Sequence, residues 1–243
     1  QRALIDGLRI LIPSYIGLGT GIAGLLLLNA AYVRYGLLGL GALAPIITLG
    51  LAVFAMLLVV ALKWAVMGRF RPVIKPLWSP YVWLNEMVNG AYESVMAPAI
   101  APFLGTPFMA AFLRLLGCRI GRGCYIETTL FSEFDLVQIG DYAALNFGAV
   151  IQNHLFEDRV MKSSYLHIGD SCAVGNMAVV LYDSEMAGGA VLGPLSLLMK
   201  GESLAAGSTW HGIPCTPALP PGPEPPLALP AASALPADLA AAS

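Results

Sequence analysis

A run of seven hexads decides the fold: residues 168–209 read IGDSCA, VGNMAV, VLYDSE, MAGGAV, LGPLSL, LMKGES and LAAGST. Every hexad begins with an aliphatic residue, and Gly or Ala follows it in five of the seven. The fifth position is small in six hexads, with Glu202 as the exception. A repeat of this regularity is not expected by chance.

The same frame runs through Ile139, Leu145 and Ile151 and through Ile120 and Ile126, which makes twelve hexads. An aliphatic and a small residue in every six are typical of a parallel β-helix. Each hexad forms a short flat side, the aliphatic residue fills the interior, and the small residue allows a tight turn. Stacked coils then bury one continuous core. We predict a mainly β fold with a β-helix over residues 117–216.

Two breaks interrupt the frame. One lies between Phe131 and Gln138, and the other replaces eleven residues, 157–167, between two hexads. Insertions in a solenoid leave it as loops, often on the binding face. We therefore expect the functional site at these breaks.

The chain is 57% hydrophobic and only 12% charged, with a mean hydropathy of +0.73. Residues 10–33 and 35–62 are uncharged runs of 24 and 28 residues, each above the roughly 20 that cross a bilayer. They predict a two-helix transmembrane hairpin, with buried helices as the alternative. Six basic residues flank the pair, against Arg34 alone between the spans: Arg2, Arg9, Lys63, Arg69, Arg71 and Lys75. This bias predicts a multi-pass protein of the cell membrane whose β-helix is cytoplasmic.

Charge separates the two parts of the chain. Residues 1–76 hold seven Lys/Arg and one acid, and residues 77–243 hold six Lys/Arg and fourteen acids. The basic part borders apolar sequence, which indicates membrane contact and gives no support for a nucleic-acid partner. The four cysteines form no C-x-x-C pair and are expected to be small buried residues in a reducing compartment.

These patterns divide the chain into four regions. Residues 1–76 form the transmembrane hairpin, and residues 77–116 form a juxtamembrane bridge of two short amphipathic helices. Residues 117–216 form the β-helix, and the Pro/Ala-rich residues 217–243 form a disordered tail. The start at Gln1 suggests a processed product or a piece of something longer.

His154 is the best candidate for a general base, because it directly precedes the second break. The ordinary pKa of histidine, about 6.5, suits proton abstraction near neutral pH, and a carboxylate at the other ring nitrogen would fix the tautomer. The alternative is a turn histidine that caps backbone groups. Four carboxylates are candidates for the partner, two nearby in sequence and two from the coil below: Glu157, Asp158, Glu133 and Asp135.

The other polar candidates carry weaker signals. Arg159 and Lys162 suit a phosphate or carboxylate but equally suit solvated loop charges. His167 and His211 are expected at the solvent face and in the closing segment, and their unequal spacing from His154 argues against a zinc site. No nucleotide-binding or G-x-S-x-G motif is present, so this piece encodes no ATP-consuming chemistry.

Several short sequence motifs carry a resemblance to known protein families. The hexads resemble the left-handed β-helix of the hexapeptide-repeat acyltransferases, with three hexads per coil and about four coils here. Most of residues 1–215 is similar to the C-terminal region of single-module nonribosomal peptide synthetases of the ε-poly-L-lysine synthetase type. The strings that carry this resemblance are WSP (78–80), NE (85–86), YES (92–94), RLLG (114–117), TT (128–129), EFDL (133–136) and HLFEDRVMK (154–162).

In that family, adenylation and carrier domains load an amino acid as a phosphopantetheine thioester, and membrane-associated tandem domains form amide bonds. The resemblance implies that this piece is the last such domain. It would bind no cofactor directly and would act with a carrier-borne phosphopantetheine thioester and tandem β-helix copies. His154 would deprotonate the attacking amine or carry the proton during collapse onto the thioester, and Glu157 or Asp158 would hold a cationic acceptor. We predict five substrate-binding residues: Asn153, Arg159, Lys162, Glu133 and Asp135.

Two other functions stay open: a membrane-anchored acyl-CoA-dependent acyltransferase, and a non-catalytic module that organises active copies at the membrane. An oligomer with sites between subunits is also open.

Overall fold

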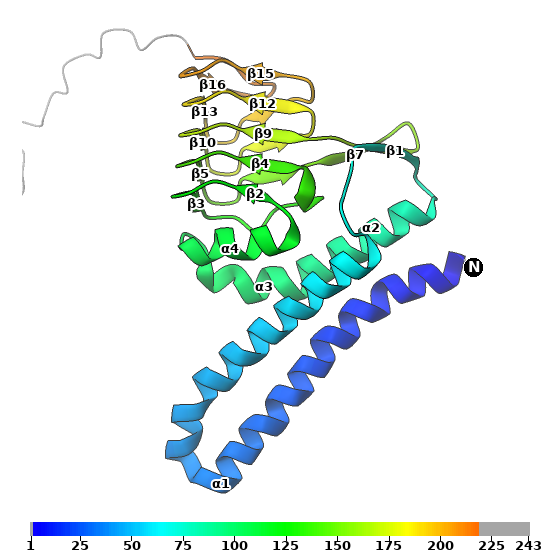
Figure 1. Cartoon of the computed structure of the whole chain (residues 1–243), viewed down its shortest axis with the longest axis vertical. Coiled ribbons are helices and arrows are strands. Elements are labelled where there is room, and N and C mark those ends of the chain that lie inside the picture. The colour runs from blue at the N-terminus through cyan, green and yellow to red at the C-terminus, as the bar shows by residue number, and fades with distance from the viewer. Residues whose placement is uncertain (1, 219–243) are drawn as a thin grey trace, which may run out of the picture.

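The computed structural model describes residues 2–218. The predicted tail was residues 217–243, so from residue 219 onward it lies outside the described residues. A helical part precedes a stack of short strands (Figure 1). The helical elements are α1 (Arg2–Val66), α2 (Pro80–Ala91), a π-helical turn (Tyr92–Met96), α3 (Ala97–Ile100), a 3-10 turn (Ala101–Phe103) and α4 (Pro107–Leu116). Where two amphipathic helices were predicted, α2 runs through the π turn into α3, and α4 follows separately.

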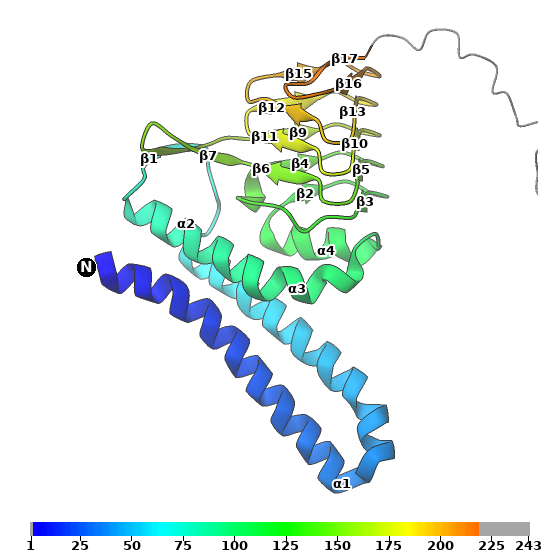
Figure 2. The same ribbon diagram turned by 180° about the vertical axis from the view of Figure 1, so that it is seen from behind.

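Parallel strands form the three sides of a coil that rises from α4 (Figure 2). The first side contains β2 (Arg119–Ile120), β4 (Val137–Ile139), β9 (Leu166–Ile168), β12 (Ser184–Met186) and β15 (Ser203–Leu204). The second contains β3 (Tyr125–Ile126), β5 (Ala144–Leu145), β10 (Ala173–Val174), β13 (Val191–Leu192) and β16 (Thr209–His211), with β17 (Thr216–Pro217) antiparallel at its end. The third contains β6 (Val150–Gln152), β11 (Val179–Leu181) and β14 (Leu197–Leu198).

The strand register repeats every 18 residues in the upper coils, which is three hexads. On the first side Ile168 pairs with Met186, and Met186 pairs with Leu204. On the second side Val174 pairs with Leu192. The six-residue period of the sequence therefore becomes one side of the coil, and three periods complete a turn.

The two breaks in the hexad frame are local departures from this coil. At the second break the chain leaves the coil as an antiparallel hairpin of β7 (His154–Glu157) and β8 (Val160–Ser163). Strand β1 (Val73–Pro76), from the segment after α1, adds to β8 as a third strand. At the first break Glu133 has a left-handed φ of 36°, and a 3-10 turn follows over Phe134–Leu136.

The core of the coil follows the hexad frame. The first residue of every predicted hexad is buried, with at most 9% of its surface exposed: Ile120, Ile126, Ile139, Leu145, Ile151, Ile168, Val174, Val180, Met186, Leu192, Leu198 and Leu204. Full burial of one such side chain contributes roughly 1.5–3 kcal/mol. The predicted core positions are confirmed. Of the four cysteines expected to be buried, Cys118, Cys172 and Cys215 are buried free thiols, whereas Cys124 is only half-buried.

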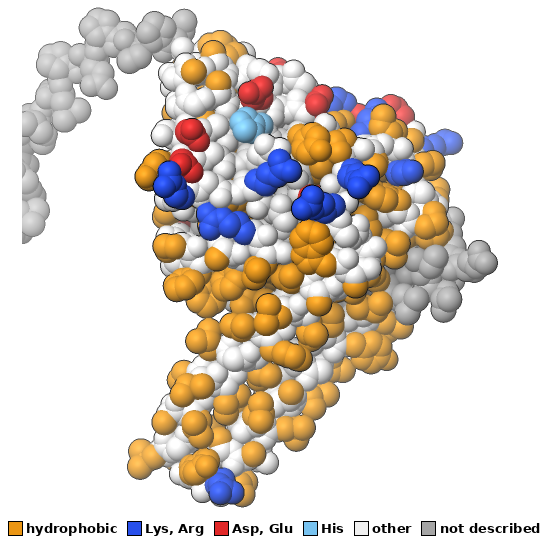
Figure 3. Space-filling model, in the orientation of Figure 1, with side chains coloured by type: hydrophobic (Ala, Val, Ile, Leu, Met, Phe, Trp, Pro, Cys, Tyr) orange, Lys and Arg blue, Asp and Glu red, His pale blue; other side chains and the backbone are white. Residues whose placement is uncertain are grey.

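The structure describes α1 as one helical element of 65 residues, broken at Gly36, where φ is 68° and ψ is −165°. The sequence predicted two separate helices with Arg34 between them. The chain reverses at this break, and its two arms lie side by side in both views (Figures 1 and 2). By length and composition, the segment Ile10–Val66 of α1 could cross a membrane, and hydrophobic side chains cover the visible face of the arms (Figure 3).

The helices close the base of the coil and share its core. Tyr92 of the π turn is buried and packs edge-on against Phe134, with ring centroids 4.9 Å apart. Its hydroxyl donates to the Thr129 carbonyl oxygen at 2.7 Å. Ser79 caps α2, because its hydroxyl oxygen accepts a hydrogen bond from the Val82 N–H. These contacts fix the orientation of α2 and the π turn against the segment of the coil at the first break.

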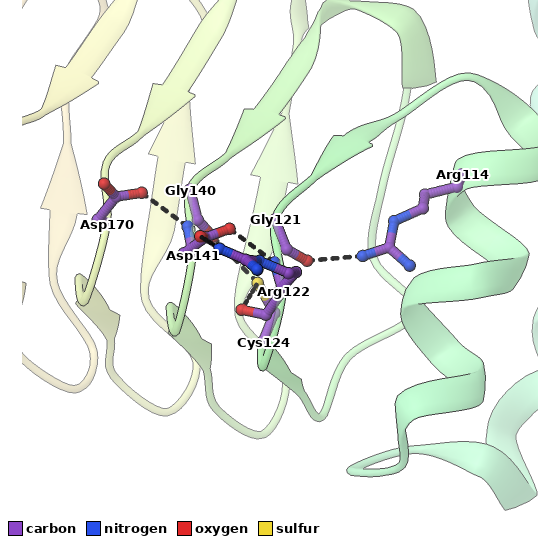
Figure 4. A network of polar contacts seen from close by, with 7 residues as sticks. All are labelled: Arg114, Gly121, Arg122, Cys124, Gly140, Asp141 and Asp170. Carbon is purple, nitrogen blue, oxygen red and sulfur yellow. Dashed lines mark hydrogen bonds and ion pairs between the residues drawn. The ribbon is translucent and has the colours of Figure 1, made fainter.

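A polar ladder fixes one corner of the coil (Figure 4). The Asp170 carboxylate accepts from the Asp141 N–H, and the Asp141 carboxylate accepts from the Arg122 N–H, both at 2.7 Å. Arg114 of α4 donates to the Gly121 carbonyl oxygen at 2.6 Å. A Cβ at Gly140 would overlap Asp170, so the corner requires glycine there.

Candidate active site

His154 begins β7, at the point where the chain leaves the coil. The preceding residue, Asn153, is fully buried. Its backbone N–H donates to the Ser132 hydroxyl at 3.1 Å, and its side-chain amide donates to the Ser164 carbonyl oxygen at 3.3 Å. Asn153, expected to bind substrate, thus holds the base of the hairpin and sets the direction of His154.

The partner of His154 comes from the first break. The Nδ1 atom of His154 lies 2.7 Å from Oε2 of Glu133. The Glu133 side chain is fully buried, whereas that of His154 is 15% exposed. Because Nδ1 is engaged by the carboxylate, Nε2 is the ring nitrogen that remains to accept a proton.

Two asparagines of α2 hold the other oxygen of Glu133. The side-chain amide of Asn85 donates to Oε1 at 2.9 Å, and that of Asn89 donates to the same atom at 3.3 Å. Both asparagines are buried. Because their NH₂ groups face a carboxylate, their amide oxygens point elsewhere, and neither oxygen has a hydrogen-bond partner within the described part of the chain. Helix α2 therefore orients Glu133, and Glu133 orients His154.

The two members of this dyad stabilise each other's charged forms. Burial alone would raise the pKa of Glu133, but the hydrogen bond and charge of His154, with further side-chain hydrogen bonds, hold it below its ordinary value. Burial alone would lower the pKa of His154, but Glu133, with the charges of Glu86 and Glu93, raises it above the ordinary value. The dyad is therefore a hydrogen-bonded pair whose base is strengthened by nearby carboxylates.

Two cavities meet at His154. The first has a volume of about 480 Å³ and a mixed polar and apolar lining, and it lies between α1, the α2 helix with its π turn, and the coil. Its lining residues are Ile10, Ser14, Glu86, Asn89, Gly90, Glu93, Ser94, Ser132, His154 and Phe156. Two carboxylates line it, and no Lys or Arg does so among the described side chains.

The second cavity is mostly apolar and has a volume of about 460 Å³. It lies between the π turn, the start of α3 and the open third side of the coil. Its lining residues are Tyr92, Glu93, Ala97, Thr129, Leu130, Phe131, Ser132, Val150, Ile151, Gln152 and His154. The two cavities share Glu93, Ser132 and His154, so one base can reach ligands in both.

The structure does not bring Glu157 or Asp158 to His154. They lie at the far end of the β7–β8 hairpin, three and four residues beyond His154. Lys162 contacts the carboxylates of Glu157 and Asp158 at 3.2 and 3.3 Å, and Lys200 also pairs with Glu157. Arg159 is exposed at the turn, with a left-handed φ of 62°. These charges form a surface network at the hairpin tip.

Asp135 also lies away from His154. Its carboxylate accepts from the ammonium of Lys63 at 2.6 Å and from the Phe70 N–H at 3.1 Å. Lys63 is fully buried, and the Asp135 side chain is 11% exposed. The pair joins the end of α1 to the loop that carries Glu133, so Asp135 supports the site from behind.

The other two histidines lie elsewhere. His167 is exposed on β9, on the first side of the coil, and His211 is exposed at the end of β16. Among the side chains that the structure describes, no three from His, Cys, Asp or Glu converge in a group that could hold a metal ion.

Sequence reasoning missed the contribution of the helix before the coil. Asn85, Glu86, Asn89 and Glu93 line the dyad or its cavity, yet no role was predicted for them. A signal was present: Glu86, Asn89 and Glu93 recur at spacings of three and four, which gathers polar groups on one helix face. Such a face is unexpected on a helix that packs against an apolar domain.

Comparison with known proteins gives one strong sequence match. Over 222 residues, 89% of this chain, the sequence is 41% identical to delta-poly-L-ornithine synthetase of Acinetobacter baumannii (strain AB307-0294). The chain spans about 16% of the length of that curated relative. No protein-family profile matches the chain.

Solved acetyltransferases are distant neighbours of the structure. A hexapeptide-repeat-containing acetyltransferase from Vibrio cholerae has a TM-score of 0.38 and 12% identity, over 51% of this chain and 85% of that one. A maltose O-acetyltransferase from Clostridium difficile 630 has a TM-score of 0.35 and 16% identity, over 43% and 59%. A likeness of this degree has no bearing on activity.

Proposed function

We propose that this chain is an amide-forming acyl-transfer domain of a membrane-bound nonribosomal peptide synthetase. The sequence match to a poly-amino acid synthetase supports this class of reaction. One observation carries the proposal: a buried carboxylate holds His154 where two cavities meet, one of mixed lining and one mostly apolar. Two different ligands, an amine and an acyl donor, can therefore reach one base from two adjoining cavities.

His154 acts as a general base in this proposal. Nε2 accepts a proton from the neutral attacking amine as the amine nitrogen forms a bond to the acyl carbon. As the carbon–sulfur bond of the donor breaks, His154 returns the proton to the sulfur, so an amide and a thiol leave. Glu133 keeps the ring in one tautomer and stabilises its protonated form. Asn85 and Asn89 keep Glu133 in place.

A carrier-borne phosphopantetheine thioester would supply the acyl group in activated form. The mostly apolar cavity would receive this arm, because its lining combines Tyr92, Leu130, Phe131 and Ile151 with the polar residues Thr129, Ser132 and Gln152 and includes His154. The residues that would hold the arm come from the π turn and from the third side of the coil. The adenylation and carrier domains and further β-helix copies are the partners we propose.

The architecture we propose is a left-handed β-helix of hexapeptide repeats over residues 117–216. A bridge over residues 77–116 joins it to a membrane hairpin over residues 1–76. The reversal of α1 at Gly36 and the 18-residue register support these assignments. With the basic flanks of the two arms on one side, the β-helix and its site are cytoplasmic and adjoin the membrane surface.

The test uses the complete synthetase with His154→Ala and, as a matched control, His167→Ala on the exposed face of β9. We expect His154→Ala to abolish amide product while loading of the carrier persists, and His167→Ala to behave as wild type. Amide formation by His154→Ala at the wild-type rate would reject the proposal and favour a non-catalytic module. Use of a coenzyme A thioester in place of the carrier would favour the acyl-CoA-dependent alternative.

A further inference from the structure

We infer that the base of the coil binds the headgroup of an anionic phospholipid, and that Arg114 and Arg119 hold its phosphate. The site is a groove of about 530 Å³ between the end of α4 and the first strands of the coil. This inference goes beyond acyl transfer at His154 and rests only on the membrane hairpin of the proposed function.

The end of α4 lies at the level where the second arm of α1 ends. Trp64, in the last turn of α1, donates from its indole N–H to the Leu115 carbonyl oxygen at 2.9 Å. Trp64 is 41% exposed, and exposed indole rings favour the headgroup zone of a bilayer. Arg114 directly precedes Leu115. With α1 in the membrane, this hydrogen bond places Arg114 at the bilayer surface.

Helix α4 has apolar side chains on two faces, and Arg114 is its one charged residue. One face is buried against the coil: Met109, Ala110, Leu113 and Leu116. Phe108 and Leu115 lie seven residues apart on the other face and are 61% and 47% exposed. An apolar helix face that is open to solvent beside the apolar arms of α1 suits the interface of a bilayer.

The groove beside α4 offers guanidinium groups without carboxylates. Arg114, Arg119 and Gln138 line it, and no Asp or Glu does so among the described side chains. Nε and Nη2 of Arg114 donate to the carbonyl oxygens of Ile120 and Gly121 at 3.0 and 2.6 Å, as Figure 4 shows for Gly121. The guanidinium is therefore held in place while its charge stays unpaired. Arg119 is exposed on β2 and has no ion-pair partner among the described side chains.

The two arginines lie at the end of the groove that is nearest to α4. Arg119 on β2 pairs in register with Gln138 on β4, and Gln138 pairs with His167 on β9, so His167 lies two strands further from α4. Guanidinium groups present paired N–H donors that match phosphate oxygens. Lys and Arg side chains also gather beside the hydrophobic arms on the visible face (Figure 3).

This combination favours a lipid over other anionic partners. Basic side chains at a bilayer surface attract anionic headgroups more than zwitterionic ones. An acidic protein domain would match the charge of the groove, whereas a phospholipid also matches the exposed apolar face of α4.

The test uses the full chain in detergent micelles, mixed with equal amounts of phosphatidylglycerol and phosphatidylcholine. Native mass spectrometry then counts the molecules of each lipid that stay bound. We expect wild type to retain phosphatidylglycerol in preference, and Arg119→Gln to lower the ratio of the two lipids by about fivefold. Arg119→Lys keeps the charge and should keep most of the preference. Arg159→Gln makes the same chemical change at the hairpin tip and should retain lipid as wild type.

Equal retention of the two lipids by wild type would overturn the inference. An equal loss in Arg159→Gln would also overturn it, because it would show attraction to surface charge in general. Displacement of phosphatidylglycerol by an equal concentration of inorganic phosphate would identify a free-phosphate site instead. Carrier-domain binding that is lost in Arg119→Gln, without any lipid preference, would identify a protein-docking surface instead.

The result is separable from the proposed function. If an alkaline wash releases the chain from vesicles, the membrane hairpin fails and the lipid site fails with it. If the chain stays in the membrane but Arg119→Gln retains both lipids as wild type does, only the lipid site fails. His154→Ala should leave the lipid ratio unchanged, because His154 does not line the groove.

Discussion

The Nδ1 atom of His154 lies 2.7 Å from Oε2 of Glu133, and this contact joins the two places where the hexad frame is broken. Glu133 has a left-handed backbone at the first break, and His154 starts the hairpin at the second. The regular coil supports both residues but supplies neither. The reactive pair is therefore built from the irregular parts of the fold, which leave room for the two cavities.

The carboxylate of the dyad should control the rate of acyl transfer and its dependence on pH. We expect Glu133→Gln to lower the rate by about 10- to 100-fold, part of the roughly 10²–10⁴ that a positioned base contributes. The base must be neutral, so the rate rises as pH passes the pKa of His154, which Glu133 raises. Without that carboxylate the rise should move to lower pH. An unchanged midpoint in the rate profile of Glu133→Gln, with Glu185→Gln as control, would refute the coupling.

The same pair should stabilise the fold within a limited range of pH. The pKa of Glu133 is lowered, so its contribution is complete above its ordinary value of 4.5 and is lost as pH falls through the lowered pKa. The pKa of His154 is raised, so its contribution is complete below its ordinary value of 6.5 and is lost as pH rises through the raised pKa. The unfolding free-energy difference between wild type and Glu133→Gln should be largest between these values. A difference that does not vary with pH would contradict this.

The buried pair of Lys63 and Asp135 should be coupled energetically. Lys63→Met leaves a largely buried carboxylate without its cation, which we expect to cost about 3–5 kcal/mol. Asp135→Asn keeps an acceptor for the Phe70 N–H, so the double variant should lose less stability than the two single variants together. Denaturant unfolding in micelles, arranged as a double-mutant cycle, measures this coupling. Additive losses would show that the two residues act independently.

Because of the polar ladder of Asp170, Asp141 and Arg122, Gly140 and Gly188 should differ in their tolerance of alanine. A Cβ at Gly140 would overlap Asp170, and we expect Gly140→Ala to cost about 1–3 kcal/mol of stability. At Gly188 the nearest atom to a Cβ is the Asp170 carbonyl oxygen at 3.5 Å, so Gly188→Ala should stay within about 0.5 kcal/mol of wild type. Thermal unfolding of both variants checks the difference, and equal midpoints would argue against a steric requirement.

The coil could be predicted from the sequence because its signal is local and repeated. Residues such as Ile168, Met186 and Leu204 each fill the interior for the same reason, so the period reveals the core and the breaks. The hairpin at the second break has no such signal. Its third strand, β1, pairs Val73 with Ser163, which lies ninety residues further along the chain. No periodic pattern in the sequence predicts a contact at that separation.

The site could be predicted only in part. His154 and Glu133 were both candidates because each lies at a break in the frame. Asn89 and Glu93 were missed because their role depends on how α2 and the π turn pack on the coil, which the residues of that helix do not encode alone. Glu157 was favoured over Glu133 because it lies near His154 in sequence, but an extended strand carries it away at about 3.4 Å per residue.

The measurement that tests the central claim most directly is the single-turnover rate of amide formation by the loaded synthetase with His154→Ala, with and without added imidazole. If His154 is the base, the rate should fall by about 10²–10⁴, and imidazole should restore part of it by occupying the space beside Glu133. The variant Glu133→Gln should not be rescued in this way, since it still has its own imidazole ring. A His154→Ala rate equal to that of wild type would contradict the account.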